Sequence, residues 1–359
     1  MVAEKITKFG TFLFKKKRRP ILIISFIILN VIVIILTAKA EFGNSQNATK
    51  LSEVKMNWWL LIPAALCFVF AINLEIQKYV LMIKEAAKEK YDKRKARQIA
   101  RRTVLLGKYY DNITPAAIGG QPFQIFYMRR NSGLKKGAST SIPIFGMIAG
   151  QIAFLVIAMF CFIFGAYAIN NPVLFTTAWF GLIFFAFWPV MILGVTFVPK
   201  PTIKFIKLIV KFLAKIKIVK RREAVLEKVE SEIKESAGSV KMILKTKGLF
   251  MKTVLLSLGF NLLIVCIPFF VLAAFGGSVN FWVALTTTVA VMSAVYFIPT
   301  PGNSGAAEGT FFLVFSGLSS GYVFWAMLVW RFFSYYIYII IGPIIYFIMH
   351  LEKKHNVKN

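Results

Sequence analysis

The stretch Phe297-Ile-Pro-Thr-Pro-Gly-Asn-Ser-Gly-Ala-Ala-Glu-Gly309 breaks the apolar segment Trp282–Leu318 with prolines, glycines and one glutamate. A second stretch of this kind, Asn112-Ile-Thr-Pro-Ala-Ala-Ile-Gly-Gly-Gln-Pro122, breaks the apolar segment Thr103–Met128. Proline ends helices, and glycine permits tight turns and close backbone approach. Irregular backbone is tolerated in lipid hydrocarbon only inside protein or along a wet cavity. The two stretches therefore predict broken helical hairpins enclosed by intact helices; surface loops between ordinary spans are the alternative.

The composition around these stretches excludes a soluble protein. Of 359 residues, 58% are hydrophobic and only 16% are charged, whereas soluble domains carry about 25% charged residues. Disorder is also excluded, because 36 phenylalanines and 15% aromatic residues are too apolar for an unfolded chain. The sequence therefore predicts an integral membrane protein.

Six segments have the roughly 20 apolar residues that a membrane-spanning helix needs. They are Pro20–Ala38, Trp58–Ile83, Ser141–Ile169, Leu174–Val198, Leu249–Phe275 and Val323–Met349. The first follows the basic run Lys15–Arg19 and is too long for a cleaved signal peptide.

The basic residues give the topology. The chain has 44 Lys and Arg against 15 acids, and 37 of the 44 lie in segments 1–19, 84–102, 129–136, 200–248 and the tail after 350. By the positive-inside rule these segments, and both termini, are cytoplasmic. Each broken segment must then enter and leave the membrane on one side.

The predicted fold class is an all-α polytopic membrane protein in a single membrane domain, 1–359. Six spans and two opposed re-entrant hairpins form an inverted repeat, with halves 1–169 (re-entrant 103–128) and 174–349 (re-entrant 282–318). Residues 200–248 form a cytoplasmic basic insertion. Eight full spans are the alternative, but they place 129–136 outside, against the charge rule.

An internal match supports the repeat. Thr114-Pro115-x-x-x-Gly119-Gly120 aligns without gaps with Thr300-Pro301-x-x-x-Gly305-Ala306, so that Thr114 corresponds to Thr300. Both copies fall on the two segments for which the charge rule predicts re-entry.

Ionisable residues at membrane depth are functional candidates by default. Glu308 lies in the second broken stretch, and Arg331 lies about a third of the way into the last span. The alternative to a functional role is that the two form a purely structural ion pair. Glu75 and Lys78, one turn apart near the end of a span, are predicted to form a local interfacial pair. The predicted substrate-path residues are Glu308, Arg331, Asp111, Gly119, Gly120, Gln121, Gln124, Pro301, Gly302, Gly305 and Tyr335.

The remaining patterns predict neither a catalytic residue nor a cofactor nor a metal site. Cys67, Cys161 and Cys266 lie inside apolar runs without metal-ligand spacing, and neither a Walker motif nor a dinucleotide-binding glycine pattern occurs. Lysines at three- and four-residue steps in 203–219 predict an amphipathic helix on an anionic inner leaflet. A nucleic-acid partner is not expected, because the charge is spread over membrane-flanking loops.

Three ordered motifs resemble the lysylphosphatidylglycerol synthase transmembrane family over essentially the whole chain. They are Thr114-Pro-Ala-Ala-Ile-Gly-Gly-Gln-Pro-Phe-Gln-Ile-Phe-Tyr127 with the later Gly133, Phe297–Gly309 as quoted above, and Trp330-Arg331 with Tyr335-Tyr336. In the founding members this flippase-like domain moves aminoacylated phosphatidylglycerol to the outer leaflet and counters cationic antimicrobial peptides. There it is fused to a cytoplasmic aminoacyl-tRNA-dependent synthase, whereas this sequence ends at Asn359. The resemblance therefore implies the translocator half without the lysyltransferase half.

From these observations we expect a lipid translocator of the bacterial cytoplasmic membrane, with lysylphosphatidylglycerol as the leading phospholipid substrate. Arg331 and helix N-termini would hold the lipid phosphate, and Glu308 with Asp111 would meet a headgroup amine or relay a proton. A phosphatidylglycerol lysyltransferase-type enzyme and a carrier of an undecaprenyl-phosphate-linked lipid are the alternatives, so enzymatic activity stays open. Besides the phospholipid, a second copy of the chain and a separate lipid-modifying enzyme are candidate partners.

Overall fold

The computed structural model describes residues 35, 56–87, 91–114, 117, 119–169, 171–198, 200, 201, 203, 204, 207, 208, 210, 247–277, 279–296, 298, 300, 302–316 and 322–356. Apart from Ile35, the predicted first span lies outside the described residues, as does most of the basic insertion 200–248 with its amphipathic helix. The described residues form helices and no strands, which confirms the predicted all-α class.

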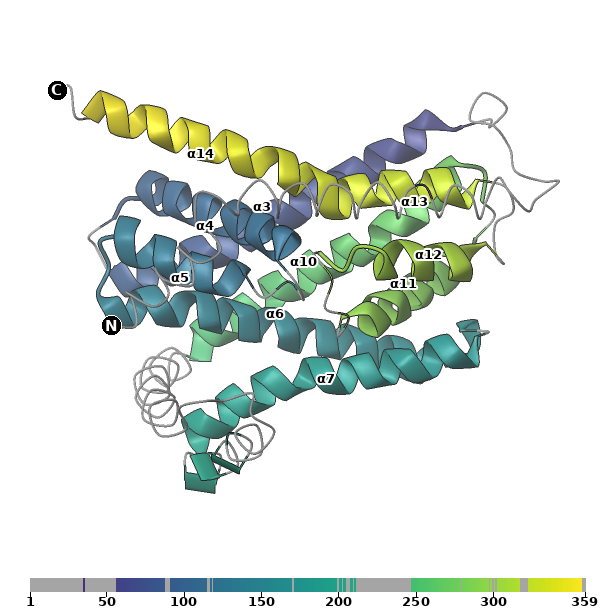
Figure 1. Cartoon of the computed structure of the whole chain (residues 1–359), viewed down its shortest axis with the longest axis horizontal. Helices are drawn as coiled ribbons and strands as arrows, with labels where there is room; N and C mark the ends of the chain where they lie inside the picture. Colours follow the sequence, from purple (N-terminus) through teal and green to yellow (C-terminus); the bar gives the residue numbers. More distant parts are fainter. Residues whose placement is uncertain are drawn as a thin grey trace.

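Figure 1 shows these helices running roughly parallel to one long axis. They are α3 (Leu61–Ala87), α4 (Lys93–Ile113), α5 (Gly120–Asn131), α6 (Lys136–Phe164), α7 (Pro172–Phe197), α10 (Lys247–Ala274), α11 (Phe281–Val295), α12 (Ala306–Phe315), α13 (Val323–Arg331), the π-helical turn η4 (Phe332–Tyr336) and α14 (Ile337–Asn356), with short 3₁₀ turns η1 (Trp58–Leu60) and η3 (Ala166–Ala168).

Five helical segments of the described chain are long and apolar enough to cross a membrane. They are Trp58–Ala87, Lys136–Phe164, Pro172–Met191, Gly248–Ala274 and Val323–Glu352. Each overlaps one predicted span, and its ends differ from the predicted ones by at most seven residues. The chain is therefore a multi-pass membrane protein.

Each predicted broken segment consists of two helices joined by a turn: α4 and α5 form the first hairpin, α11 and α12 the second. The limbs α5, α11 and α12 have 12, 15 and 10 residues. At 1.5 Å per residue they reach about 18, 22 and 15 Å, less than the ~30 Å hydrocarbon thickness. None of these three limbs could cross the hydrocarbon by itself, whereas α4, with 21 residues, is about long enough.

The first hairpin is longer than the predicted 103–128, because α4 already begins at Lys93. Asp92 caps it there, accepting a hydrogen bond from the Lys95 backbone N–H at 2.8 Å. The first turns of α4 are basic and exposed. Hydropathy alone therefore missed this part of the hairpin.

Equivalent helices of the two halves begin at positions related by the sequence match. In the numbering of that match, where Thr114 corresponds to Thr300, the first residue of α3, Leu61, corresponds to Lys247, the first residue of α10. Gly120 at the start of α5 corresponds in the same way to Ala306 at the start of α12. The paired helices run in opposite directions in Figure 1. α3 and α10, which are related in this way, also pack closely along each other.

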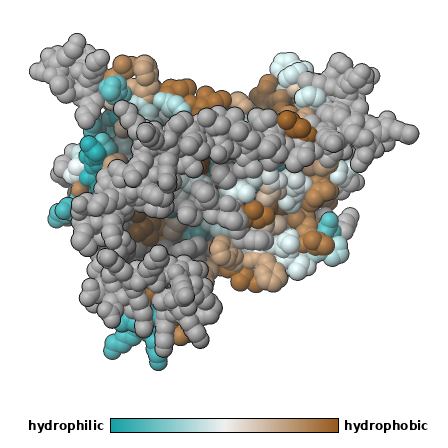
Figure 2. All heavy atoms as spheres, in the orientation of Figure 1, coloured by the Kyte–Doolittle hydropathy of each residue, from teal (hydrophilic) through white to brown (hydrophobic). Residues whose placement is uncertain are grey.

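Three apolar clusters fill the interior. One surrounds α12 and α13, one lies between α3, α4, α5 and α6, and one lies between α6, α7 and α11. The outside is apolar too: Ile62, Leu66, Val69 and Phe70 of α3 are 48–59% exposed and share one helical face. Figure 2 shows apolar residues along the upper edge and on the lower right of the visible face, and hydrophilic residues mainly at its left margin and lower tip. This pattern is expected of helices packed in lipid.

Candidate functional site

The turn of the second hairpin is held by the carboxylate of Glu308. Gly302, Asn303 and Gly305 all have left-handed backbone, with φ of 55°, 56° and 87°. The Gly305 backbone N–H donates to Glu308 Oε2 at 2.7 Å. An acidic residue in the first turn of a helix is also favoured by the helix dipole. The turn residues and Glu308 thus fix the start of α12 inside the molecule.

Arg331, the last residue of α13, closes this turn from the other side. Its Nε donates to Glu308 Oε1 at 2.7 Å, and its Nη2 donates to Ser304 Oγ at 3.1 Å and to the Gly302 carbonyl at 3.4 Å. The side chains of Arg331 and Glu308 are 5% and 2% exposed. The predicted ion pair is therefore present, and it also ties α13 to the hairpin turn.

Aromatic rings surround the guanidinium. Arg331 Cζ lies 4.3 Å from the centroid of Tyr335, and Trp330 stacks on Phe311 with centroids 4.6 Å apart. Tyr335 reaches this position through the π-helical turn η4, which follows Arg331 directly. A Cβ at Gly302 would lie 2.3 Å from the Tyr335 ring, so only glycine fits there. π-helical turns occur frequently at functional sites, and the sequence pattern gave no sign of this one.

The turn of the first hairpin repeats the design with different residues. The Gly120 backbone N–H donates to Asp111 Oδ1 at 2.8 Å, and the Gly119 N–H donates to Thr114 Oγ1 at 2.9 Å. A Cβ at Gly120 would lie 2.2 Å from Asp111 Oδ1. The close approach of Asp111 to the start of α5 therefore requires glycine at that position.

The two predicted glutamines of α5 have different environments. Gln124 is buried, and its Oε1 accepts a hydrogen bond from the Tyr79 hydroxyl of α3 at 2.9 Å. It also packs against Gly107 of α4, so it links the hairpin to α3. Gln121 is half-buried, and its Oε1 has no hydrogen-bond partner within the described part of the chain.

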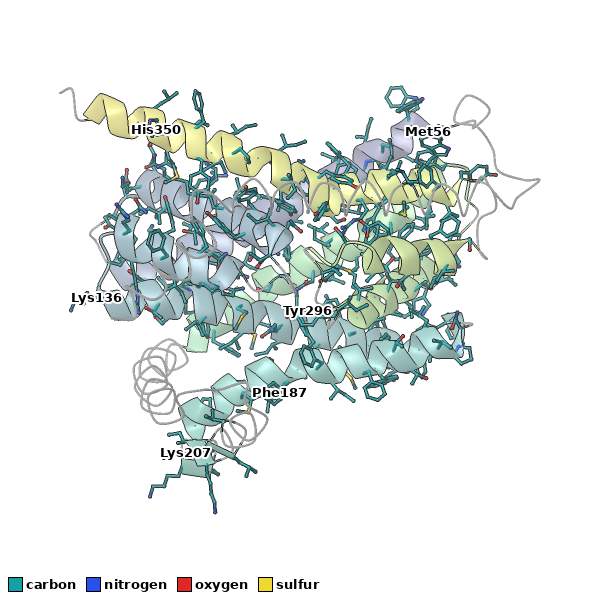
Figure 3. The ribbon with its side chains drawn as sticks, viewed as in Figure 1. Met56, Lys136, Phe187, Lys207, Tyr296 and His350 are labelled. Atoms are coloured by element: carbon teal, nitrogen blue, oxygen red, sulfur yellow. The ribbon has the colours of Figure 1, made fainter. Side chains whose placement is uncertain are left out.

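The two hairpin turns meet each other. A Cβ at Gly302 would lie 3.0 Å from the Asn112 carbonyl oxygen, so the two backbones are in contact. In Figure 3, Tyr296 at the end of α11 lies between the molecular end marked by Met56 and the end marked by Lys136 and His350. Both turns thus lie well inside the bundle. Of the predicted site residues, Pro301 lies outside the described residues.

The last membrane-spanning segment, which comprises α13, η4 and α14, contacts both hairpins. Beyond Arg331, the Tyr346 hydroxyl of α14 lies 2.6 Å from the Tyr110 hydroxyl of α4, and Glu352 Oε1 pairs with Arg102 Nη2 at 2.5 Å. A displacement of either hairpin would therefore also displace this segment.

The prediction for Glu75 and Lys78 was wrong in one respect. They do pair, with Lys78 Nζ 2.8 Å from Glu75 Oε2, but Lys78 is 2% exposed and also donates to the Gly146 carbonyl of α6 at 3.1 Å. The pair is buried between helices rather than interfacial. Two charges inside a predicted span were the only sequence signal for it.

No group of three or more His, Cys, Asp or Glu side chains that could hold a metal ion occurs among the described residues. The site therefore consists of two charged pairs, one carboxylate-held turn in each hairpin, and aromatic rings around Arg331. Such charges at broken helices inside an apolar bundle define the class: a polytopic membrane protein with an internal polar centre.

The comparison with protein families gives the particular membership. The family model for the lysylphosphatidylglycerol synthase TM region matches residues 22–342, and the chain belongs to that family. It is thus a membrane protein of the family named for the lysylphosphatidylglycerol pathway. The comparisons with curated proteins and with solved structures found no match.

Proposed function

We propose that the protein moves a phospholipid between the two leaflets of a bacterial cytoplasmic membrane. The observation that carries the proposal is the buried Glu308–Arg331 pair at the place where two broken helical hairpins touch. Charges at membrane depth are costly and mark substrate or ion paths. Breaks in transmembrane helices are used by transporters to build binding sites near the midplane.

The hairpins would re-enter the membrane from opposite sides. The helix α4, whose first turns are basic and exposed, lies toward the end of the molecule that carries Lys136 and His350 (Figures 1 and 3). This charge supports a cytoplasmic location for that end and for the end of α14. Trp58 and Trp59 are 70% and 78% exposed and precede α3 at the other end, as an aromatic belt at a membrane interface would.

The chemistry of the pair fits a headgroup with a phosphate and an amine. Arginine binds phosphate oxygens through its planar fork, and Arg331 lies beside the start of α12, whose dipole also favours an anion. If the pair separates during transport, Arg331 can take the phosphate while Glu308 takes a headgroup ammonium. Lysylphosphatidylglycerol carries both groups, whereas an undecaprenyl phosphate carries only the first.

The test is a leaflet-specific lipid probe on vesicles that contain the purified protein. We expect Arg331→Lys and Glu308→Gln to slow translocation by about tenfold or more, since each loses a charge-assisted hydrogen bond at the site. Arg101→Gln, which removes an exposed arginine of α4, is the matched control and keeps the wild-type rate. Wild-type translocation in both site variants, at normal protein levels, contradicts the proposal.

The substrate is tested separately by lipidomics of lipid that co-purifies with the protein. Enrichment of lysylphosphatidylglycerol over phosphatidylglycerol in wild type, lost in Glu308→Gln, supports the two-charge headgroup. Enrichment of an undecaprenyl-linked phosphate, unaffected by Glu308→Gln, assigns the protein to the alternative lipid class. Synthesis of aminoacyl-lipid from charged tRNA by the purified chain would instead assign an enzyme.

A further inference from the structure

Lys108 is a charged residue of the first hairpin that the proposed function does not use. It lies on α4, one turn before Asp111, and its Nζ is 5.2 Å from the ring centroid of Phe260 on α10. Within the described ranges Lys108 forms no ion pair and no hydrogen bond. A cation against an aromatic face is stabilised, but its charge is not neutralised.

A second ammonium lies nearby. Lys78 of α3 and Lys108 repel each other, while Asp111 attracts Lys108. Lys78 is neutralised by Glu75 at 2.8 Å and bonded to the Gly146 carbonyl. Of these two ammonium groups, only that of Lys108 has no ion-pair partner among the described residues.

The carboxylates of this region are already engaged. Glu75 is bound to Lys78, and Asp111 accepts the Gly120 backbone N–H at 2.8 Å. Among the described residues, neither lies within 4.0 Å of the Lys108 ammonium. Lys108 is half-buried, so part of the residue is accessible at the surface of the bundle.

From this arrangement we infer that Lys108 forms an anion-binding station on the first hairpin for the phosphate of a phospholipid. This inference rests on the proposed function and deepens it: the lipid phosphate meets Lys108 on the cytoplasmic side of the path and Arg331 further in. Free inorganic phosphate offers the same oxygen chemistry, and the experiment separates the two sources.

The experiment measures binding of short-chain phosphatidylglycerol to the full chain in neutral detergent. We expect Lys108→Gln to weaken binding by about tenfold, as loss of one charge-assisted hydrogen bond does. Lys108→Arg keeps the charge and retains most of the affinity. Lys95→Gln, an exposed lysine on the same helix, is the matched control and binds as wild type.

Two further ligands test the chemistry. Short-chain diacylglycerol, which lacks phosphate, should bind more weakly than phosphatidylglycerol and should be insensitive to Lys108→Gln. Equal binding of both lipids, or an equal loss with Lys95→Gln, overturns the station. Binding of inorganic phosphate as tightly as phosphatidylglycerol would assign the site to the free anion and overturn the lipid part of the inference.

Failure of the station and failure of the proposed function give different results. If Lys108→Gln weakens lipid binding but wild type does not translocate lipid, the station stands and the translocator proposal fails. If the Arg331 variant stops translocation while Lys108→Gln changes neither binding nor transport, the translocator proposal stands and the station fails. A thermal unfolding curve of Lys108→Gln that matches that of wild type confirms that folding is intact. If the curves differ, two further variants decide. Wild-type binding by Lys108→Ala would overturn the station, and wild-type binding by Lys108→Arg together with weak binding by Lys108→Ala would support it.

Discussion

The two hairpins use one structural device with different charge. In each, a carboxylate accepts a backbone N–H at the start of the returning helix: Asp111 from Gly120 in the first, Glu308 from Gly305 in the second. Asp111 stands before its turn, whereas Glu308 stands after its own. Of these two carboxylates, only Glu308 has an arginine bound to it within the described part of the chain.

The difference shows that the two halves can share the same helix positions without having charged residues at the same positions. The returning helices begin at the matched positions Gly120 and Ala306. The residue that corresponds to Arg331 in the same numbering is Phe145, a buried apolar residue of α6. The positive charge near the first turn is instead that of Lys108, one helical turn before Asp111. The second turn is thus closed by the Glu308–Arg331 salt bridge, whereas Lys108 near the first turn has no salt-bridge partner among the described residues.

The largest expected effect is on the closed turn. Arg331→Met leaves the buried Glu308 carboxylate without its partner, and breaking a buried pair in this way costs about 3–5 kcal/mol. The double variant Arg331→Met with Glu308→Gln has no unpaired charge and should regain much of that stability. Thermal unfolding of the purified protein in detergent measures both.

A double variant no more stable than Arg331→Met alone would contradict this explanation, because the loss would then not come from an unpaired charge. Loss of lipid translocation in a stable double variant would separate the functional role of the pair from its structural role.

A smaller effect is expected at the first turn. Gly120→Ala places a Cβ 2.2 Å from Asp111 Oδ1, and overpacking of this kind costs about 1–3 kcal/mol. Gly248→Ala is the control, because a Cβ at Gly248 meets nothing within 4 Å. In the same unfolding measurement, we expect a lower midpoint than wild type for Gly120→Ala and no decrease for Gly248→Ala. Equal midpoints would mean that the Asp111 contact does not hold the turn.

The smallest effect concerns the link between the first hairpin and α3. Tyr79→Phe removes the hydroxyl that donates to Gln124 Oε1 at 2.9 Å, and a hydrogen bond of this type contributes about 1 kcal/mol. Hydrogen exchange of α5 measured by mass spectrometry should rise in this variant more than exchange of α12. A uniform rise in both hairpins would show that Tyr79 supports the whole bundle instead.

The membrane class, the five described spans and the positions of both hairpin turns could be predicted from the sequence, because they depend on local properties. A run of about 20 apolar residues makes a span. Clusters of proline and glycine break both hairpin segments, whereas single prolines such as Pro143 and Pro268 lie inside continuous helices. Glu308 and Arg331 were identifiable for the same reason, since a charge within an apolar run is visible without any structure.

Tertiary packing alone decided which side chains meet. The burial of Lys78 depends on α6, which supplies the Gly146 carbonyl from a distant part of the chain. Contact between Asn112 and Gly302 joins two turns from opposite halves of the sequence, and the π-helical turn that directs Tyr335 toward Arg331 has no sequence signature here. Residue spacing fixes which residues share a helix face, but only the packed bundle determines what that face contacts, because such contacts link distant parts of the chain.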